Sequence, residues 1–219
     1  MATAVKSKAR AAPPAPAGGL RQERARQRRL HLSEVVMSLI QERGFGAVSV
    51  NEVAERASMS IGGLYRYITT KSDLLELVCD KINLGLIEEM KAAADTTRGV
   101  SEKLAAAIRT YWHRHWDAAP AILVAYREYP LLSDASKKRY TEQERAIAEY
   151  FGDLIRAGAA IDEFRPVDER LLAHEIILLS HMRALKGWAF ADRTREDVLR
   201  EHIELIFSRL APRASEPNN

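Results

Sequence analysis

The 219-residue sequence has one cysteine, few aromatic residues and no long hydrophobic run. A lone cysteine, Cys79, cannot form a disulfide within the chain, which fits a reducing compartment. No apolar stretch is long enough to cross a bilayer, and the basic N-terminus has no apolar block of the kind found in signal peptides. We therefore expect a cytoplasmic protein with no membrane partner.

Motifs of common enzymes and metal sites are also missing. The sequence has no nucleophile elbow, no phosphate-binding loop and no paired-cysteine zinc pattern. His113 and His115 would point about 200° apart on a helix, and His174 and His181 would lie about 10 Å apart along one, so neither pair can bind a single metal ion. We expect no enzymatic activity, no metal and no cofactor.

The residues that are abundant favour helices. Alanine, leucine, glutamate and arginine are frequent, no run alternates as a strand does, and the 47% hydrophobic content is enough for a real core. The composition therefore predicts an all-α fold. Positive charge is concentrated at one end, because residues 1–30 contain eight lysines and arginines against one glutamate, although the whole chain has a net charge of only +3.

The stretch of residues 49–73 is the one that folding alone explains least. Ser49 and Glu52 have the spacing of a capping box, and Ser60 can act as a second N-cap after the apolar pattern breaks at Ser58. This pattern predicts a helix, a tight turn and a second helix. The apolar stripe of the second helix consists of Ile61, Leu64 and Ile68, which leaves Gly63, Tyr65, Arg66 and Tyr67 free to touch a partner.

Two glycines and a lysine in this stretch favour a phosphate partner. Gly62 and Gly63 lie in the first turn of the second helix, where each costs up to about 1 kcal/mol relative to alanine but lets backbone N–H groups approach a phosphate. Lys71 falls just after a Thr70 cap, where the helix dipole disfavours a cation and a bound phosphate would remove the conflict. Taken singly, these residues fit a tight turn and a solvated lysine; together they favour DNA binding.

These residues resemble the N-terminal signature of TetR/AcrR-family transcriptional regulators. Ser58, Ile68 and Ser72 depart from it, standing where glycine, phenylalanine and glutamate are commoner. The resemblance implies an all-α homodimer with N-terminal three-helix helix-turn-helix modules and a larger C-terminal helical domain for ligand binding and dimerisation. The matching segments, about a quarter of the chain, are Gly44-Phe45, Val48-Ser49-Val50, Val53-Ala54, Ala57-Ser58-Met59-Ser60, Gly62-Gly63-Leu64-Tyr65, Tyr67 and Lys71-Ser72-Asp73-Leu74-Leu75.

We expect the module to contact double-stranded DNA with several residues in distinct roles. Tyr65, Tyr67 and Lys71 are predicted to anchor phosphates, and Arg66 to reach base edges. The arginine-rich start of the first helix could lie along the phosphate backbone, send an arm into the minor groove or simply be solvated. The predicted DNA-binding residues are Ser49, Ser60, Gly62, Gly63, Tyr65, Arg66, Tyr67 and Lys71.

The chain is expected to divide into four parts. They are a disordered basic tail (1–22), a helix-turn-helix DNA-binding domain (23–80), a ligand-binding and dimerisation domain (81–211) and a second tail (212–219). Outside residues 49–70, helices are predicted over about 21–43, 71–94, 101–117, 120–129, 134–160, 168–191 and 194–210. The helix over 71–94 connects the two domains, so we expect it to transmit ligand binding to the DNA-binding module.

The last two predicted helices are apolar on more than one side, and each therefore needs two partners. One partner is the subunit core. The other, we infer, is the same helix pair of a second subunit, and a charge at Ile206 or Phe207 should then disrupt the dimer. A monomer with wholly buried helices is the alternative.

By the resemblance, the C-terminal helices surround a pocket for a small molecule. Residues 182–188 are similar to segments of regulators associated with acyl-thioester or fatty-acid control, which implies a hydrophobic acid or an acyl-CoA as effector. We predict a repressor that such an effector releases from a pseudo-palindromic operator. The alternative is an architectural or RNA-binding protein that uses the basic N-terminus and has no effector pocket. The predicted ligand-binding residues are Trp112, Tyr126, His181, Arg183 and Trp188.

Overall fold

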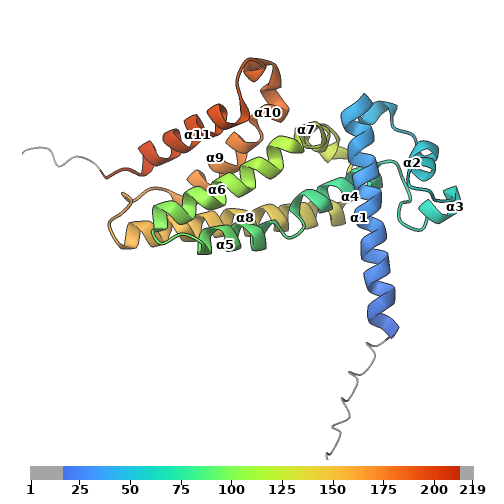
Figure 1. The fold of residues 1–219 in the computed structure, drawn as a ribbon, viewed down its shortest axis with the longest axis horizontal. Helices are drawn as coiled ribbons and strands as arrows, with labels where there is room; N and C mark the ends of the chain where they lie inside the picture. Colours follow the sequence, from blue (N-terminus) through green and yellow to red (C-terminus); the bar gives the residue numbers. More distant parts are fainter. Residues whose placement is uncertain (1–16, 213–219) are drawn as a thin grey trace, which may run out of the picture.

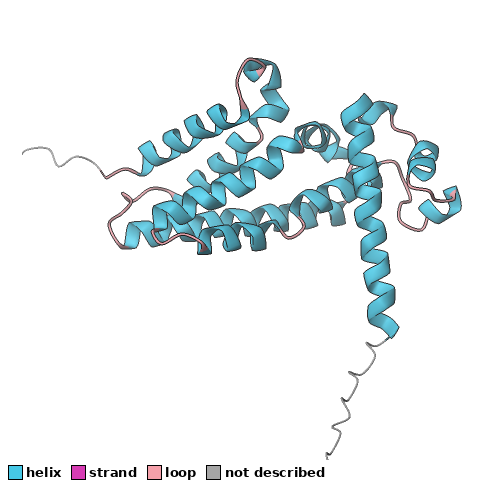
Figure 2. Cartoon of the chain, in the orientation of Figure 1, coloured by secondary structure: helices cyan, strands magenta, loops and turns pink. Residues whose placement is uncertain are grey.

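The computed structural model describes residues 17–212, and every regular element in this range is a helix (Figures 1 and 2). The predicted all-α fold is therefore confirmed. Residues 1–16 and 213–219, which make up most of the two expected tails, lie outside the described residues. The first helix begins at Ala17, four residues before its predicted start, and ends at Arg43, where Gly44 was expected to stop it.

The elements form a long bundle that is crossed at one end by α1. The N-terminal half of α1 projects beyond the bundle, and α2 and α3 lie on the outer side of α1 (Figure 1). In chain order the elements are α1 (Ala17–Arg43), η1 (Phe45–Ala47), α2 (Val50–Arg56), α3 (Ile61–Leu64), α4 (Ser72–Asn83), α5 (Leu86–Asp95), α6 (Val100–Asp117), α7 (Ala119–Glu128), η2 (Tyr129–Leu131), α8 (Asp134–Ala160), α9 (Glu169–Ser180), α10 (Met182–Lys186), η3 (Gly187–Phe190) and α11 (Arg195–Leu210).

Two predicted helices are wrong, because each is broken in the middle. The connecting helix over 71–94 is divided into α4 and α5 by Gly85, whose φ of 68° lies in the left-handed region that glycine adopts without strain. The helix over 168–191 stops at Ser180. At this point the His181 N–H donates to the Leu178 carbonyl in a tightened turn, and the shorter α10 and η3 follow.

Side chains pack in two separate cores. The N-terminal core is formed by α1, α2, α3 and α4, and α7 contributes Ala121, Ile122 and Ala125 to it, with Ala118 just before the helix. The C-terminal core is formed by α5, α6, α8, α9 and α11. Although α7 lies within the expected C-terminal domain (81–211), its apolar face therefore completes the core of the predicted DNA-binding domain.

The helices at the C-terminal end have apolar residues on two sides, as expected. Leu171, Leu178 and Leu185 recur every seven residues on α9 and α10 and are exposed, as is Leu205 on α11. The choice of Ile206 as an interface residue is wrong, because Ile206 is buried in the C-terminal core. The rows of buried and exposed residues are adjacent on α11, and the helical pattern alone does not say which row faces the subunit core.

Candidate DNA-binding surface and internal cavity

The two helix starts of the predicted DNA-reading unit are formed as expected. The Ser49 hydroxyl accepts a hydrogen bond from the Glu52 N–H at 3.2 Å, and the Ser60 hydroxyl accepts one from the Gly63 N–H at 3.1 Å. The reciprocal half of the capping box is absent, because the Glu52 carboxylate pairs with Arg43 instead. Both serine hydroxyls thus act as helix caps, and they set the residues at which α2 and α3 begin.

The predicted apolar stripe of the second helix is only partly correct. Leu64 and Ile68 are buried, but Ile61 is 47% exposed. The reason is that α3 ends at Leu64, so Ile68 reaches the core from a following turn rather than from the same helical face. Ile61 and Tyr65, which is 54% exposed, therefore lie on the surface of the module.

Gly62 and Gly63 differ in what the fold requires of them. A Cβ atom added to Gly63 would lie 3.0 Å from the Ser60 hydroxyl oxygen, so this glycine protects the helix cap. A Cβ added to Gly62 would meet nothing within 4 Å, and the backbone there has no positive φ. The packing of the described residues does not require glycine at position 62. A missing side chain there would instead let a partner approach the backbone closely.

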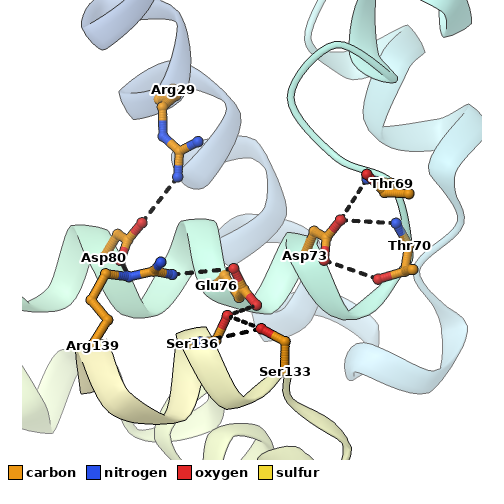
Figure 3. A network of polar contacts seen from close by, with 9 residues as sticks. All are labelled: Arg29, Thr69, Thr70, Asp73, Glu76, Asp80, Ser133, Ser136 and Arg139. Carbon is orange, nitrogen blue, oxygen red and sulfur yellow. Dashed lines mark hydrogen bonds and ion pairs between the residues drawn. The ribbon is translucent and has the colours of Figure 1, made fainter. Parts of the chain in front are cut away.

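Lys71 has a different setting from the predicted one. Thr70 does not cap α4: its N–H and hydroxyl donate to the Asp73 carboxylate at 2.9 and 3.0 Å (Figure 3). Partial burial alone would raise the pKa of Asp73, but the bonds from Thr69 and Thr70 lower it. The Lys71 ammonium donates to the Gly46 carbonyl at 2.9 Å and lies 5.1 Å from the centre of the Phe45 ring. Its conflict with the helix dipole is therefore relieved within the protein.

A cavity of about 320 Å³ lies between α7, the start of α8 and His181. We call it the α7–α8 cavity. Two of the five predicted ligand-binding residues, Tyr126 and His181, meet in its wall, where their Oη and Nδ1 atoms are 2.9 Å apart. On the other side of the imidazole, the Nε2 atom lies 3.2 Å from the Tyr111 hydroxyl. Both ring nitrogens of His181 are thus hydrogen-bonded to tyrosines.

His181 in the cavity wall and His115 behind it, with 4.9 Å between their ring centres, carry no charge at neutral pH. Burial lowers the pKa of His181 to about 4. Burial, together with the neighbouring His181, lowers the pKa of His115 to about 3. His115 stacks on the Tyr111 ring with 3.9 Å between ring centres and donates through Nδ1 to the Tyr111 carbonyl at 2.8 Å. The wall is therefore polar but uncharged on this side.

The other three predicted ligand-binding residues do not line this cavity. The buried Trp112 donates its indole N–H to His202 Nδ1 at 3.2 Å, and Trp188 is 78% exposed. Arg183 donates to the Trp116 carbonyl at 2.7 Å and lies over that ring. Sequence reasoning missed the lining residues Tyr129, Tyr140 and Glu144. The four-residue spacing of Tyr140 and Glu144 on one helix was the available signal.

A network of charged side chains ties α8 to α4 and α1 beside this cavity (Figure 3). Arg139 on α8 pairs with Glu76 at 3.1 Å and with Asp80 at 3.3 Å, and Asp80 also accepts from Arg29 on α1 at 3.0 Å. Arg139 is adjacent in the chain to Tyr140, which lines the cavity and packs against the N-terminal core. This part of α8 is therefore bonded directly to two helices of the predicted DNA-binding domain.

Within residues 17–212, no helix is long and apolar enough to span a membrane. In the same range, no group of three or more histidine, cysteine, aspartate or glutamate side chains is arranged so that it could hold a metal ion.

Known transcriptional regulators are similar to this chain in sequence and in structure. The chain is 28% identical over 178 residues to the HTH-type transcriptional regulator HbdR of Aromatoleum sp. (strain CIB), covering 81% of this chain and 76% of the relative. A tetR-family regulatory protein from Rhodococcus RHA1 has a similar structure, with a TM-score of 0.72, 20% identity and coverage of 85% of this chain and 98% of that one. AibR, solved with isovaleryl coenzyme A and operator DNA, has a TM-score of 0.65, 17% identity and coverage of 82% and 98%.

Family-level similarity extends over both parts of the chain. Residues 34–78 match the family described as bacterial regulatory proteins, tetR family, and this range contains the two capped helix starts. Residues 97–210 match the tetracyclin repressor-like C-terminal domain, which includes every residue that lines the α7–α8 cavity. The chain therefore belongs to the TetR family of transcriptional regulators.

Proposed function

We propose that this protein is a repressor that binds a pseudo-palindromic operator and is released from it by a small effector in the α7–α8 cavity. The observation that carries the proposal is the double role of α7. One face of this helix completes the N-terminal core through Ala121 and Ile122, while Tyr126 on the same helix lines the cavity. A ligand that moves α7 must therefore disturb the packing of the DNA-binding module.

The proposed DNA contacts are the residues that the sequence indicated, with α3 facing the major groove. Support comes from the open space around Gly62 and the exposure of Ile61 and Tyr65. Lys71 already bonds to a carbonyl, but an ammonium has three donors and can contact a phosphate as well. The exposed leucines of α9, α10 and α11 form the proposed dimer face. A twofold dimer then reads two half-sites about 34 Å apart or slightly more.

The chemistry of the cavity favours an acyl-CoA over a free acid as effector. Among the described residues that line it, none is lysine or arginine, and one, Glu144, is acidic. A ligand carboxylate would be repelled there, whereas a thioester carbonyl is neutral and can accept a hydrogen bond from a tyrosine hydroxyl. The volume suits an acyl group, and a structurally similar regulator, AibR, was solved with isovaleryl coenzyme A and operator DNA. Arg183, which we expected to bind the ligand, is not among the lining residues.

Release of labelled operator DNA, measured by fluorescence anisotropy, tests the proposal. The operator is first obtained by binding-site selection, and two subunits should bind each duplex. A panel of short-chain and aromatic acyl-CoAs is then compared with the matching free acids. We expect at least one acyl-CoA to lower DNA affinity about tenfold, and DNA to lower the affinity for that acyl-CoA by the same factor, about 1.4 kcal/mol.

The variant Tyr126→Phe serves to locate the effector. It removes one hydroxyl from the cavity wall and leaves the α7 face of the N-terminal core intact. We expect a weaker response to the acyl-CoA with unchanged operator affinity. Release by every free acid as effectively as by its thioester would contradict the acyl-CoA assignment. RNA binding without operator selection would favour the architectural alternative.

A further inference from the structure

A groove of about 720 Å³ separates the N-terminal half of α1 from the end of α3. We call it the α1–α3 groove. Its lining includes Arg24, Arg28 and His31 on α1, and Arg66 and Tyr67 just after α3. These α1 residues lie on the part of the helix that projects beyond the bundle.

The arginines of α1 fall into two groups. Arg26 pairs with Glu23 at 2.8 Å, and Arg29 pairs with Asp80 on α4 at 3.0 Å. In contrast, no carboxylate among the described side chains pairs with Arg24 or Arg28, and the same holds for Arg66 across the groove. Three guanidinium groups therefore face one groove without a counter-charge.

The one carboxylate in the groove wall does not neutralise them. Hydrogen bonds from Arg26 and Gln27 hold the Glu23 carboxylate and lower its pKa to about 2. Glu23 and Arg26 thus cancel each other in charge. The side of α1 that faces the groove keeps the positive charge of Arg24 and Arg28.

The projecting half of α1 is held in place by its continuation into the core. Leu32 and Val36 are fully buried against the N-terminal core, and the ion pairs of Arg29 with Asp80 and of Lys81 with Glu34 join α1 to α4. Because one uninterrupted helix spans both parts, the positions of Arg24 and Arg28 relative to α3 are fixed before any partner binds.

We propose that the α1–α3 groove binds the sugar–phosphate backbone of duplex DNA that flanks the half-site contacted by α3. Arg24 and Arg28 lie about 6 Å apart along the helix, so each can take a different phosphate of one strand, and guanidinium groups bind phosphate through two parallel hydrogen bonds. We assign Arg66 to the same backbone from the other wall, in place of the base edge that the sequence predicted for it. The inference rests on operator binding as the proposed function.

B-form DNA fits this geometry better than duplex RNA. The groove and α3 are adjacent, so the partner must admit a helix into a groove and present its backbone beside that helix. The major groove of B-form DNA is wide enough for a helix, whereas the deep and narrow major groove of A-form RNA is not.

The double variant Arg24→Gln/Arg28→Gln tests the proposal on the full-length protein. Binding of the variant and of the wild type is measured on two duplexes of the selected operator. One has 40 base pairs, and the other is trimmed to the two half-sites. Each lost phosphate contact makes the slope of log affinity against log salt shallower by about 0.9. We therefore expect a slope shallower by about 1.8 per subunit and an affinity at least tenfold lower on the long duplex, with unchanged base preference. On the trimmed duplex, wild type and variant should differ little.

The control is Arg98→Gln/Arg109→Gln, which removes the same charge from exposed positions of the C-terminal domain. It should leave both duplex affinities nearly unchanged. Equal salt slopes for wild type and Arg24→Gln/Arg28→Gln would overturn the groove assignment while operator binding by the wild type stands. An altered base preference would also overturn it, because the arginines would then read bases. Failure of the wild type to bind any duplex would instead overturn the proposed function and this inference together.

Discussion

The α1–α3 groove and the α7–α8 cavity differ in how their polar groups are satisfied. Three arginines of the groove have no counter-charge among the described residues. In the cavity, by contrast, both ring nitrogens of His181 are bonded to tyrosine hydroxyls. The groove thus needs a charged partner, whereas the imidazole in the cavity wall already has its hydrogen-bond partners. Binding at the groove should therefore depend steeply on salt, and binding in the cavity should depend on shape and burial.

The groove and the cavity suit different partners, but contacts within the protein connect the two sites. Ile122 on α7 packs in the N-terminal core, and Arg139 on α8 is bonded to Glu76 and Asp80 of α4. Both helices that enclose the cavity are therefore anchored on the module that carries the groove. No residue of α4 or α5 lines the cavity. We therefore propose that coupling runs through α7 and α8 in place of the expected route through the connecting helix.

The largest predicted effect comes from a charge on the DNA-facing surface. We expect Gly62→Asp to lower operator affinity by more than about a hundredfold, or 2.7 kcal/mol, because it places a carboxylate where DNA phosphates approach. The fold should tolerate it, since a Cβ at position 62 meets nothing within 4 Å and an acidic residue suits the first turn of a helix. Anisotropy with labelled operator measures the loss.

Ala92→Asp is the matched control for this substitution. Ala92 is exposed on α5, in the C-terminal domain, and the variant has the same change of charge. It should bind operator nearly as the wild type does. If both variants lose affinity equally, the loss in Gly62→Asp comes from the change in net charge. The surface around α3 would then not be the surface that faces DNA.

The structure also separates what the sequence could predict from what it could not. The caps at Ser49 and Ser60 and the limits of α8 were predicted correctly, because capping and helical periodicity are local properties of the chain. Trp112 and Trp188 were treated alike, yet one is buried and the other is mostly exposed. Burial and the meeting of Tyr126 with His181, 55 residues later in the chain, depend on long-range packing that local patterns do not contain.

A second prediction concerns the neutral histidines of the cavity and the dependence of stability on pH. The folded pKa of His181 is about 4 and that of His115 about 3, both below the ordinary value of 6.5. Between these values the unfolded chain binds protons that the folded protein does not, so stability falls as the pH falls. From pH 6.5 to 5.5, we expect each of these histidines to lower the free energy of unfolding by about 1 kcal/mol.

Urea denaturation of wild type, His181→Gln and His174→Gln at the two pH values measures this effect. His181→Gln should lose about 1 kcal/mol less than the wild type over this interval. His174, an exposed histidine on α9, is the control, and its replacement should leave the pH dependence unchanged. An equal pH dependence for all three proteins would mean that burial does not keep His181 neutral.

The smallest predicted effect concerns backbone strain, which both parts of the molecule contain. Ser58, in the turn between α2 and α3, has a φ of 53°, and Asp162, after α8, has a φ of 59°. A left-handed conformation costs a non-glycine residue roughly 1–2 kcal/mol, while the extra freedom of glycine in the unfolded chain offsets about 0.5–1 kcal/mol. We expect Ser58→Gly and Asp162→Gly each to raise the free energy of unfolding by about 0.5–1 kcal/mol.

Ser72→Gly is the control of opposite sign, because Ser72 is the first residue of α4 and glycine weakens a helix. Urea denaturation, monitored by the circular dichroism of the helices, measures each change in the free energy of unfolding. It also shows whether the two cores unfold in one transition or in two. If α8, which packs against both cores, joins them into one cooperative unit, both glycine variants shift a single transition by similar amounts. If the module unfolds on its own, Ser58→Gly shifts only the transition of the N-terminal core. Such a result would contradict the anchoring of α8 in both cores, on which the proposed coupling between effector and DNA depends.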